Sequence, residues 1–182
     1  MSACFVALDF ETADYGRDSA CAVGLVRVED GAVVARVARL IRPPRRSFVF
    51  THIHGITWSD VAEEPTFAPV WREMCPVVDG AEFLAAHNAP FDRSVLRTCC
   101  AKAGIAPPNL PFRCTVRMAR QAWGLRPTRL PDVCAYLGLA LKHHDAASDA
   151  EACARIVIAA GPSLAKRNGR EPPCDVTTTR SG

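Results

Sequence analysis

The residues best suited to catalysis are acidic side chains that occur in three separate short segments. The first segment holds Asp9 and Glu11, directly after the apolar run from Cys4 to Leu8. Residues two apart on an extended strand project from the same face, so both carboxylates can converge on one ion. Oxygen ligands of this kind suit Mg²⁺ or Mn²⁺. The pair therefore indicates a metal site, although a solvated acidic strand end would have the same sequence.

The second segment runs from His87 to Asp92 and separates a short apolar stretch from a helical pattern. Pro90 is favourable at the start of a helix. Asp92 then falls in the first helical turn, where the helix dipole favours a carboxylate. Functional groups of α/β proteins commonly lie just beyond strand ends, as this segment does. Asp92 is therefore a candidate partner for the first acidic pair.

The third segment combines histidine with an acid. Asp149 is expected in the first turn of the last helix, and His144 lies five residues earlier, on the loop that leads into that helix and next to His143. A histidine in this place can lie near a metal ion that the aspartate binds without ligating the ion itself. Imidazole titrates near neutral pH, so such a histidine is a candidate general base.

The composition fits one globular domain without a membrane span. The chain has 182 residues, of which 49% are hydrophobic and 23% charged, with a net charge of +3. No apolar run approaches the roughly 20 residues that cross a bilayer. The N-terminus also lacks a basic leader. We therefore expect a cytoplasmic protein with no membrane partner.

The nine cysteines are best explained as reduced thiols in the core. None forms a Cys-x-x-Cys pair, and an odd, scattered set fits neither a disulfide framework nor a zinc knuckle. A structural cysteine-rich metal protein is disfavoured for the same reason.

The pattern of apolar residues predicts an α/β domain over residues 1–161, with a disordered tail over residues 162–182. A meander of three strands opens the domain, because Asp30-Gly31 is a strong hairpin signal between the second and third. Short strands and helices alternate after it. The predicted strands are Cys4–Leu8, Ala20–Val28, Val33–Ile41, Glu82–Ala86 and Phe112–Thr115, and the main predicted helices are Thr66–Cys75, Pro90–Ala103, Thr115–Trp123, Arg129–Leu137 and Ser148–Ala160.

Taken in order, these segments resemble the three motifs of the DnaQ-like (DEDDh) 3′–5′ exonucleases, the family of the proofreading epsilon subunit of bacterial DNA polymerase III. The matching segments are Asp9-Phe10-Glu11-Thr12, His87-Asn88-Ala89-Pro90-Phe91-Asp92 and His144-x-Ala146-x-x-Asp149. The similarity covers about residues 5–160. It implies a ribonuclease H-like (exonuclease) fold, with a mixed five-stranded sheet flanked by helices.

The resemblance also implies a reaction and a set of roles. The family hydrolyses phosphodiester bonds from the 3′ end by a two-metal-ion mechanism and releases nucleoside 5′-monophosphates. Two divalent cations, Mg²⁺ or Mn²⁺, would be held by Asp9, Glu11, Asp92 and Asp149. The general base would be His144, because it has the motif spacing to Asp149 that the preceding histidine lacks.

The expected partner is nucleic acid with a free 3′ end, single-stranded or frayed, with DNA favoured over RNA. The residues that we expect to bind substrate are Thr12, His54, Asn88 and Phe91, each of which could equally serve only packing or loop structure. Several arginines could follow the phosphate backbone, but scattered arginines are usual on a solvated surface. None of them is assigned a role from the sequence.

Two alternatives stay open, the first within the same chemistry and the second of a different class. One is an RNA-trimming 3′–5′ exoribonuclease similar to oligoribonuclease or RNase T. The other is a proofreading module whose main task is to bind a DNA polymerase. About 20 residues follow the last predicted helix, and they lack amphipathic periodicity, which favours an enzyme that acts alone.

Overall fold

The computed structural model describes residues 4–161, and the expected disordered tail at 162–182 lies outside them. A five-stranded sheet forms the centre of the fold, with the order β3-β2-β1-β4-β5. The first three strands pair antiparallel, and β4 and β5 extend the sheet in parallel to β1. The strands are β1 (Phe5–Thr12), β2 (Ala20–Glu29), β3 (Ala32–Leu40), β4 (Phe83–Ala86) and β5 (Phe112–Cys114). The mixed sheet with an opening meander is therefore confirmed.

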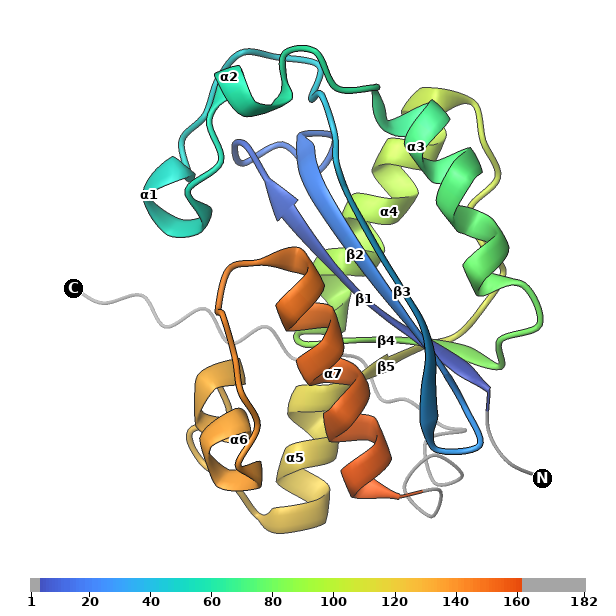
Figure 1. The fold of residues 1–182 in the computed structure, drawn as a ribbon, viewed down its shortest axis with the longest axis vertical. Coiled ribbons are helices and arrows are strands. Elements are labelled where there is room, and N and C mark those ends of the chain that lie inside the picture. The colour runs from blue at the N-terminus through green and yellow to red at the C-terminus, as the bar shows by residue number, and fades with distance from the viewer. Residues whose placement is uncertain (1–3, 162–182) are drawn as a thin grey trace.

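Helices cover both faces of the sheet (Figure 1). On one face lie α3 (Phe67–Met74) and α4 (Ala89–Ala103), and on the other lie α5 (Thr115–Trp123), α6 (Leu130–Leu137) and α7 (Ala146–Ala160). Two single-turn helices, α1 (Thr51–His54) and α2 (Trp58–Val61), lie beyond the end of β1, and a 3-10 turn (Cys75–Val78) follows α3. No helix in residues 4–161 is long and apolar enough to cross a membrane.

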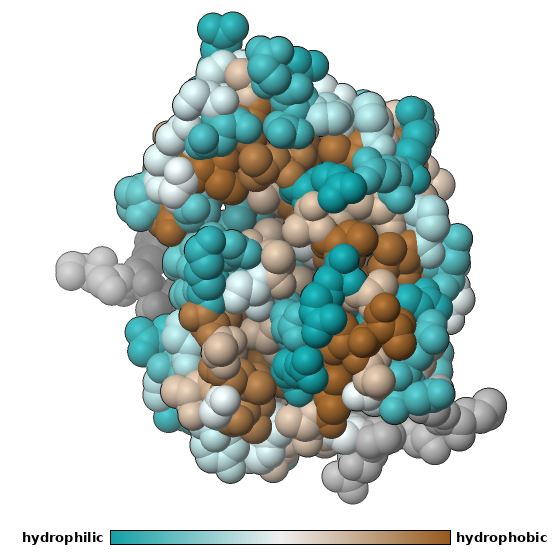
Figure 2. All heavy atoms as spheres, viewed as in Figure 1, coloured by the Kyte–Doolittle hydropathy of each residue, from teal (hydrophilic) through white to brown (hydrophobic). Residues whose placement is uncertain are grey.

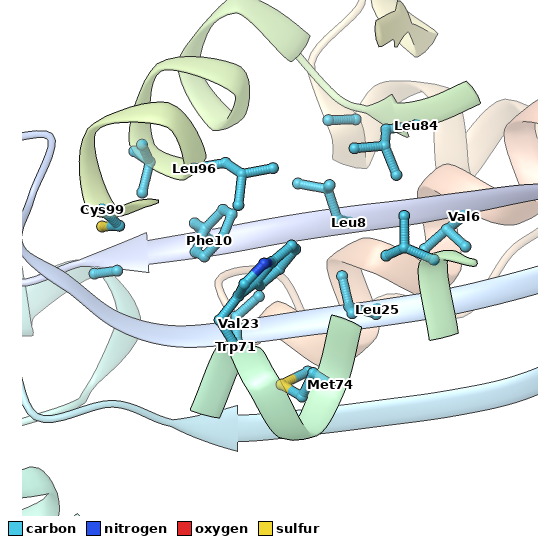
Figure 3. Packing of buried hydrophobic residues seen from close by; sticks show 14 of the residues in the cluster. Val6, Leu8, Phe10, Val23, Leu25, Trp71, Met74, Leu84, Leu96 and Cys99 are labelled. Atoms are coloured by element: carbon cyan, nitrogen blue, oxygen red, sulfur yellow. The ribbon is translucent and has the colours of Figure 1, made fainter. Parts of the chain in front are cut away.

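The alternation of side chains along β1 decides which face receives the acidic pair. Val6, Leu8 and Phe10 are buried in one cluster with residues of α3 and α4, and Figure 3 shows them on the same face of the sheet as Trp71 of α3. Neighbouring side chains on a strand point to opposite faces. Asp9 and Glu11 therefore project toward the face that α7 covers, together with the buried Phe5 and Ala7.

Several expected boundaries were wrong. The acidic pair does not follow β1 but lies inside it, because pairing with β2 continues through Phe10 and Glu11 to a bulge at Thr12. Helix α7 begins two residues early, because Oδ1 of Asp145 accepts the Ser148 N–H at 3.1 Å and caps the helix. The short helix α1 forms in a stretch for which we predicted neither a strand nor a main helix.

Every described cysteine is a free thiol, as the spacing predicted. Six of these eight are buried and extend the hydrophobic core on both faces of the sheet. Burial raises the pKa of the Cys21 thiol to about 12 and those of Cys99 and Cys100 to about 11, so these thiols stay protonated and inert at neutral pH. Cys174 lies outside the described residues.

Candidate active site

The site begins where β1 and β4 separate. Strand β4 pairs with β1 only along Phe5–Ala7 and ends at Ala86, so β1 continues without a partner on that side. There the backbone N–H of Phe10 donates to Oδ1 of Asp92 at 3.1 Å. Asp92 belongs to the first turn of α4 and is buried. The divergence of two parallel strands thus creates a crevice at their carboxyl ends, the place where α/β sheets commonly bind ligands.

Helix α7 brings the fourth carboxylate to the same crevice from the opposite face of the sheet. Oxygen atoms of Asp9, Glu11 and Asp149 all lie within 4.8 Å of one another. Oδ2 of Asp149 accepts the backbone N–H of His144 at 3.1 Å and lies 2.9 Å from Nδ1 of His143. Asp149 is 3% exposed, and its Oδ1 has no hydrogen-bond partner among residues 4–161.

The unpartnered oxygen of Asp149 fits a cation site. A buried acceptor without a partner is costly, and few exist in native structures without an ion, a water or a function to explain them. Asp9 and Glu11 supply further hard oxygen donors beside it. This donor set suits Mg²⁺ or Mn²⁺ and lacks the thiolates that would favour a softer metal.

Burial and mutual repulsion make these carboxylates unusually basic. Burial raises the pKa of Glu11 to about 7, with a further rise from the charge of Asp149. It raises the pKa of Asp9 well above its ordinary range, and the charges of Asp92 and Asp149 add to the effect. Like charges in a low-dielectric crevice cannot all ionise unless positive charge is added. The electrostatics of the site therefore favour a bound cation.

The two histidines stack on each other at the edge of the crevice. Their ring centroids are 3.7 Å apart, with 23° between the ring planes. His144 has a φ of 65°, in the left-handed region that histidine tolerates better than most residues. Burial and the neighbouring His143 lower the pKa of His144, so its imidazole is neutral and able to accept a proton at neutral pH.

Two pockets meet at the carboxylates. The first, which we call the aromatic pocket, has a volume of about 280 Å³ and is walled by Phe50, Ile53 and Phe91. Figure 2 shows this region of the surface hollowed between the α1–α2 segment and the start of α7. The second, the arginine pocket, has a volume of about 690 Å³ and is bordered by the chain that connects α5 to α6. Five residues line both pockets: Asp9, His87, Asn88, His143 and Asp149.

Two other histidines near the site have structural hydrogen bonds on both ring nitrogens. Nε2 of His54 donates to the Thr12 carbonyl at 3.2 Å, and its Nδ1 accepts the Ile56 N–H at 3.0 Å. Nε2 of His87 donates to the Thr128 carbonyl at 2.9 Å, and burial lowers the pKa of His87 to about 4. Neither imidazole is therefore free to transfer protons.

Comparison with known protein families agrees with this geometry. The model of the RNase T exonuclease family matches residues 6–157. The chain belongs to this exonuclease family. The predicted DnaQ-like membership and ribonuclease H-like fold are thereby confirmed.

Relatives of this exonuclease chain include parts of larger proteins. The PolC-type DNA polymerase III of Thermotoga petrophila is 31% identical over 161 residues, which are 86% of this chain and 12% of that protein. Exodeoxyribonuclease 10 of Escherichia coli is 36% identical over 105 residues, which are 56% of this chain and 40% of that protein. The chain thus spans less than half the length of these two relatives.

The fold of this exonuclease chain also matches solved structures. Exonuclease X, in complex with 5′ overhanging duplex DNA, superposes with a TM-score of 0.70 at 25% identity. The match covers 89% of this chain and 93% of that chain.

Every residue that we expected at the site from the sequence lies at it. The expected substrate-binding residues all line the aromatic pocket, together with the four carboxylates and His144. The expected substrate-binding residues are Thr12, His54, Asn88 and Phe91. Their location agrees with the expectation, while their roles and those of the acidic residues stay predictions. The sequence did not reveal the walls formed by Phe50 and Ile53, because that segment has no periodic pattern.

A glycine that we did not single out from the sequence determines how closely α7 approaches the sheet. Gly24 of β2 pairs with Asp9, and a Cβ atom placed on it would lie 2.2 Å from the carbonyl oxygen of Ala146, the first residue of α7. Both groups are backbone, so neither can move aside alone. A glycine inside a strand often marks such a close approach, and this signal was available in the sequence.

Gly24→Ala is therefore expected to displace the start of α7 and with it Asp149. We expect the exonuclease rate to fall about tenfold or more, because overpacking of this kind costs on the order of 1–3 kcal/mol. The Mg²⁺ concentration needed for half-maximal rate should rise in parallel. Val157→Ala at the far end of α7 is the matched control, since it weakens packing of the same helix without this overlap. If both variants keep the wild-type Mg²⁺ requirement, Gly24 does not position the site.

The raised pKa of Glu11 makes the stability of the metal-free protein depend on pH. The folded state holds the Glu11 proton up to about pH 7, whereas the ordinary value is 4.5, so the folded state binds more protons between these values. The free energy of unfolding must then fall as pH rises through this window.

Glu11→Gln removes this contribution and is expected to be more stable than wild type at about pH 8 but not at about pH 5. In EDTA the difference in melting temperature at the higher pH should be about 5 °C. The contribution of buried His87 to stability rises with pH instead of falling. His87 is present in both proteins, so its contribution cancels in the difference between them. Thermal unfolding followed by circular dichroism measures the difference. Equal melting temperatures of the two proteins at both pH values would show that ionising Glu11 does not lower the stability of the folded state.

Proposed function

We propose that this exonuclease-family chain removes nucleotides from the 3′ end of single-stranded or frayed DNA and releases nucleoside 5′-monophosphates. The observation that carries the proposal is the buried, unpartnered Oδ1 of Asp149 beside the carboxylates of Asp9 and Glu11. Such an arrangement is costly to fold unless cations complete it. The preference for DNA is supported by the similarity to an exodeoxyribonuclease and to a nuclease bound to DNA.

Two divalent cations, Mg²⁺ or Mn²⁺, would be held by Asp9, Glu11, Asp92 and Asp149. When bound, they would supply Lewis-acid catalysis and neutralise negative charge at the scissile phosphate. Asp92 is fixed by the Phe10 N–H and Asp149 by the His144 N–H, so both acids are oriented before any substrate arrives. Such preorganisation avoids a reorganisation cost during the reaction.

The remaining groups would position the substrate and move a proton. A ring nitrogen of neutral His144 would accept the proton of the attacking water. The terminal base would pack in the aromatic pocket against Phe91 and Ile53, in the way that unpaired bases pack on apolar side chains. The guanidinium of Arg17 lies over the Phe91 ring, with its carbon 4.3 Å from the ring centroid, and helps to hold the ring in place. Thr12 and Asn88 line the same pocket and would limit how far the nucleotide enters.

A DNA polymerase partner is a secondary part of the proposal. It is supported by the similarity to part of a PolC-type DNA polymerase III.

The test compares three 5′-labelled substrates with Mg²⁺ or Mn²⁺: single-stranded DNA, duplex DNA with a 3′ mismatch, and short RNA. We expect a ladder that shortens one nucleotide at a time from the 3′ end, fastest on the two DNA substrates. Faster trimming of RNA would replace the proposal with the exoribonuclease alternative. Internal cleavage, or no cleavage with either metal, would overturn it.

A further inference from the structure

We propose that the arginine pocket binds the phosphates of the nucleotides that precede the scissile bond. This inference rests on the proposed function. The pocket lies against the same carboxylates as the aromatic pocket, because Asp9, Asn88 and Asp149 line both. A nucleic-acid strand that leaves one pocket and passes over the carboxylates therefore enters the other pocket. The question is which end of the substrate each pocket receives.

The charges of the two pockets differ in a way that assigns the ends. Among the described residues, no lysine or arginine lines the aromatic pocket. Three arginines line the other pocket: Arg120, Arg126 and Arg129. The terminal nucleotide brings only the scissile phosphate, which would lie at the carboxylates. Every preceding nucleotide adds one more phosphate, and these are the groups that need arginine. The aromatic pocket thus suits the terminal nucleoside, and the arginine pocket suits the continuing strand.

The guanidinium groups differ in how available they are. Arg126 is exposed and makes no hydrogen bond or ion pair with any residue in the described range 4–161. Arg120 is also exposed, and within the described residues only its Nε makes a hydrogen bond, which it donates to Oγ1 of Thr128 at 3.1 Å. Arg129 is paired with Asp132 through two hydrogen bonds, which neutralises much of its charge. Arg126 and Arg120 are therefore the expected phosphate ligands.

The loop that carries these arginines is held in place relative to the carboxylates. His87 follows β4 and donates from Nε2 to the carbonyl of Thr128, which is buried. Arg120 of α5 contacts the hydroxyl of the same threonine. The neutral His87 thus connects the loop to the strand end beside Asp92. A loop fixed in this way presents its cations at a constant distance from the reacting phosphate, which lowers the entropic cost of binding.

The test combines binding and hydrolysis. The variant is Arg120→Ala/Arg126→Ala, and the matched control is Arg93→Ala/Arg97→Ala, which removes two exposed arginines of α4 that line neither pocket. Binding of a 5′-fluorescein-labelled single-stranded DNA 12-mer is measured by anisotropy, with Ca²⁺ in place of Mg²⁺, over a range of salt concentrations. Hydrolysis with Mg²⁺ is measured on the 12-mer and on dithymidine monophosphate with a free 5′ hydroxyl, which has no phosphate before the scissile one.

We expect the variant to bind the 12-mer at least about tenfold more weakly than the control, with a salt slope smaller by about 1.4 for two lost contacts to a single strand. The value of kcat/KM for the 12-mer should fall at least about fivefold more than that for the dinucleotide. An unchanged Kd and salt slope would overturn the inference, as would equal losses on both substrates. If the wild-type protein hydrolyses neither substrate, the proposed function itself fails, and this outcome is distinct from the others.

Discussion

Asp92→Asn is expected to lower the exonuclease rate by at least about a thousandfold while making the metal-free protein more stable. Asparagine keeps an oxygen that can accept the Phe10 N–H, so the local structure should persist. It removes the negative charge that would help to hold the cations. Burial raises the pKa of Asp92 and so opposes its ionised form, and replacing the acid with a neutral amide removes that cost. Activity and stability should therefore change in opposite directions.

The measurement pairs single-turnover hydrolysis of labelled DNA with thermal unfolding in EDTA. Asp79→Asn is the matched control, because Asp79 is exposed on a turn and lines neither pocket. We expect the control to match wild type in both assays. An Asp92→Asn protein that keeps near-normal turnover with Mg²⁺ would show that the site has been assigned wrongly. One that unfolds at a lower temperature than wild type would show that the carboxylate is structural.

His144→Asn is expected to lower the rate by roughly 10²-fold, the usual effect of losing a general base. Asparagine is the appropriate replacement, because His144 has a left-handed backbone that asparagine also adopts readily. The backbone N–H that orients Asp149 is kept, so a loss of rate reports on the imidazole. The melting temperature should stay close to that of wild type.

His143→Asn is the matched comparison, because the structure gives each histidine a different contact. Nδ1 of His143 lies 2.9 Å from Oδ2 of Asp149 and His143 lines both pockets, whereas His144 lines only the aromatic pocket and makes no side-chain hydrogen bond to Asp149 within the described residues. The motif spacing favours His144 as the base. A larger loss of rate in His143→Asn, with His144→Asn near wild type, would transfer the role to His143. Near-normal rates in both variants would mean that neither imidazole accepts the proton.

The sequence predicted what depends on periodicity. Strand alternation placed Asp9 and Glu11 on one face, and helical patterns placed Asp92 and Asp149 in first helical turns, as the structure has them. The ordered motifs linked these positions before any contact between them was known. The family and the fold followed from the same patterns.

Features that depend on contacts across the fold could not be predicted in the same way. The contact of His143 with Asp149 depends on the backbone turn at His144, which no pattern of residues indicates. The predicted end of β1 was wrong, because the strand is extended by its pairing with β2. The arginines near the site could not be separated from those elsewhere, because the position of their loop depends on the hydrogen bond from His87 to Thr128.

The site joins β1 to α7, the first strand and the last helix of the described residues 4–161, so it forms late in the synthesis of the chain. The carboxylates of β1 leave the ribosome early, but Asp149 and His144 follow only with α7. Chains emerge at about 5–20 residues per second, so the incomplete domain exists for several seconds beside messenger RNA. Throughout that time it lacks one of the acids that would hold the cations and the histidine expected to accept the proton. A nascent chain therefore has no complete active site until nearly the whole domain has been made.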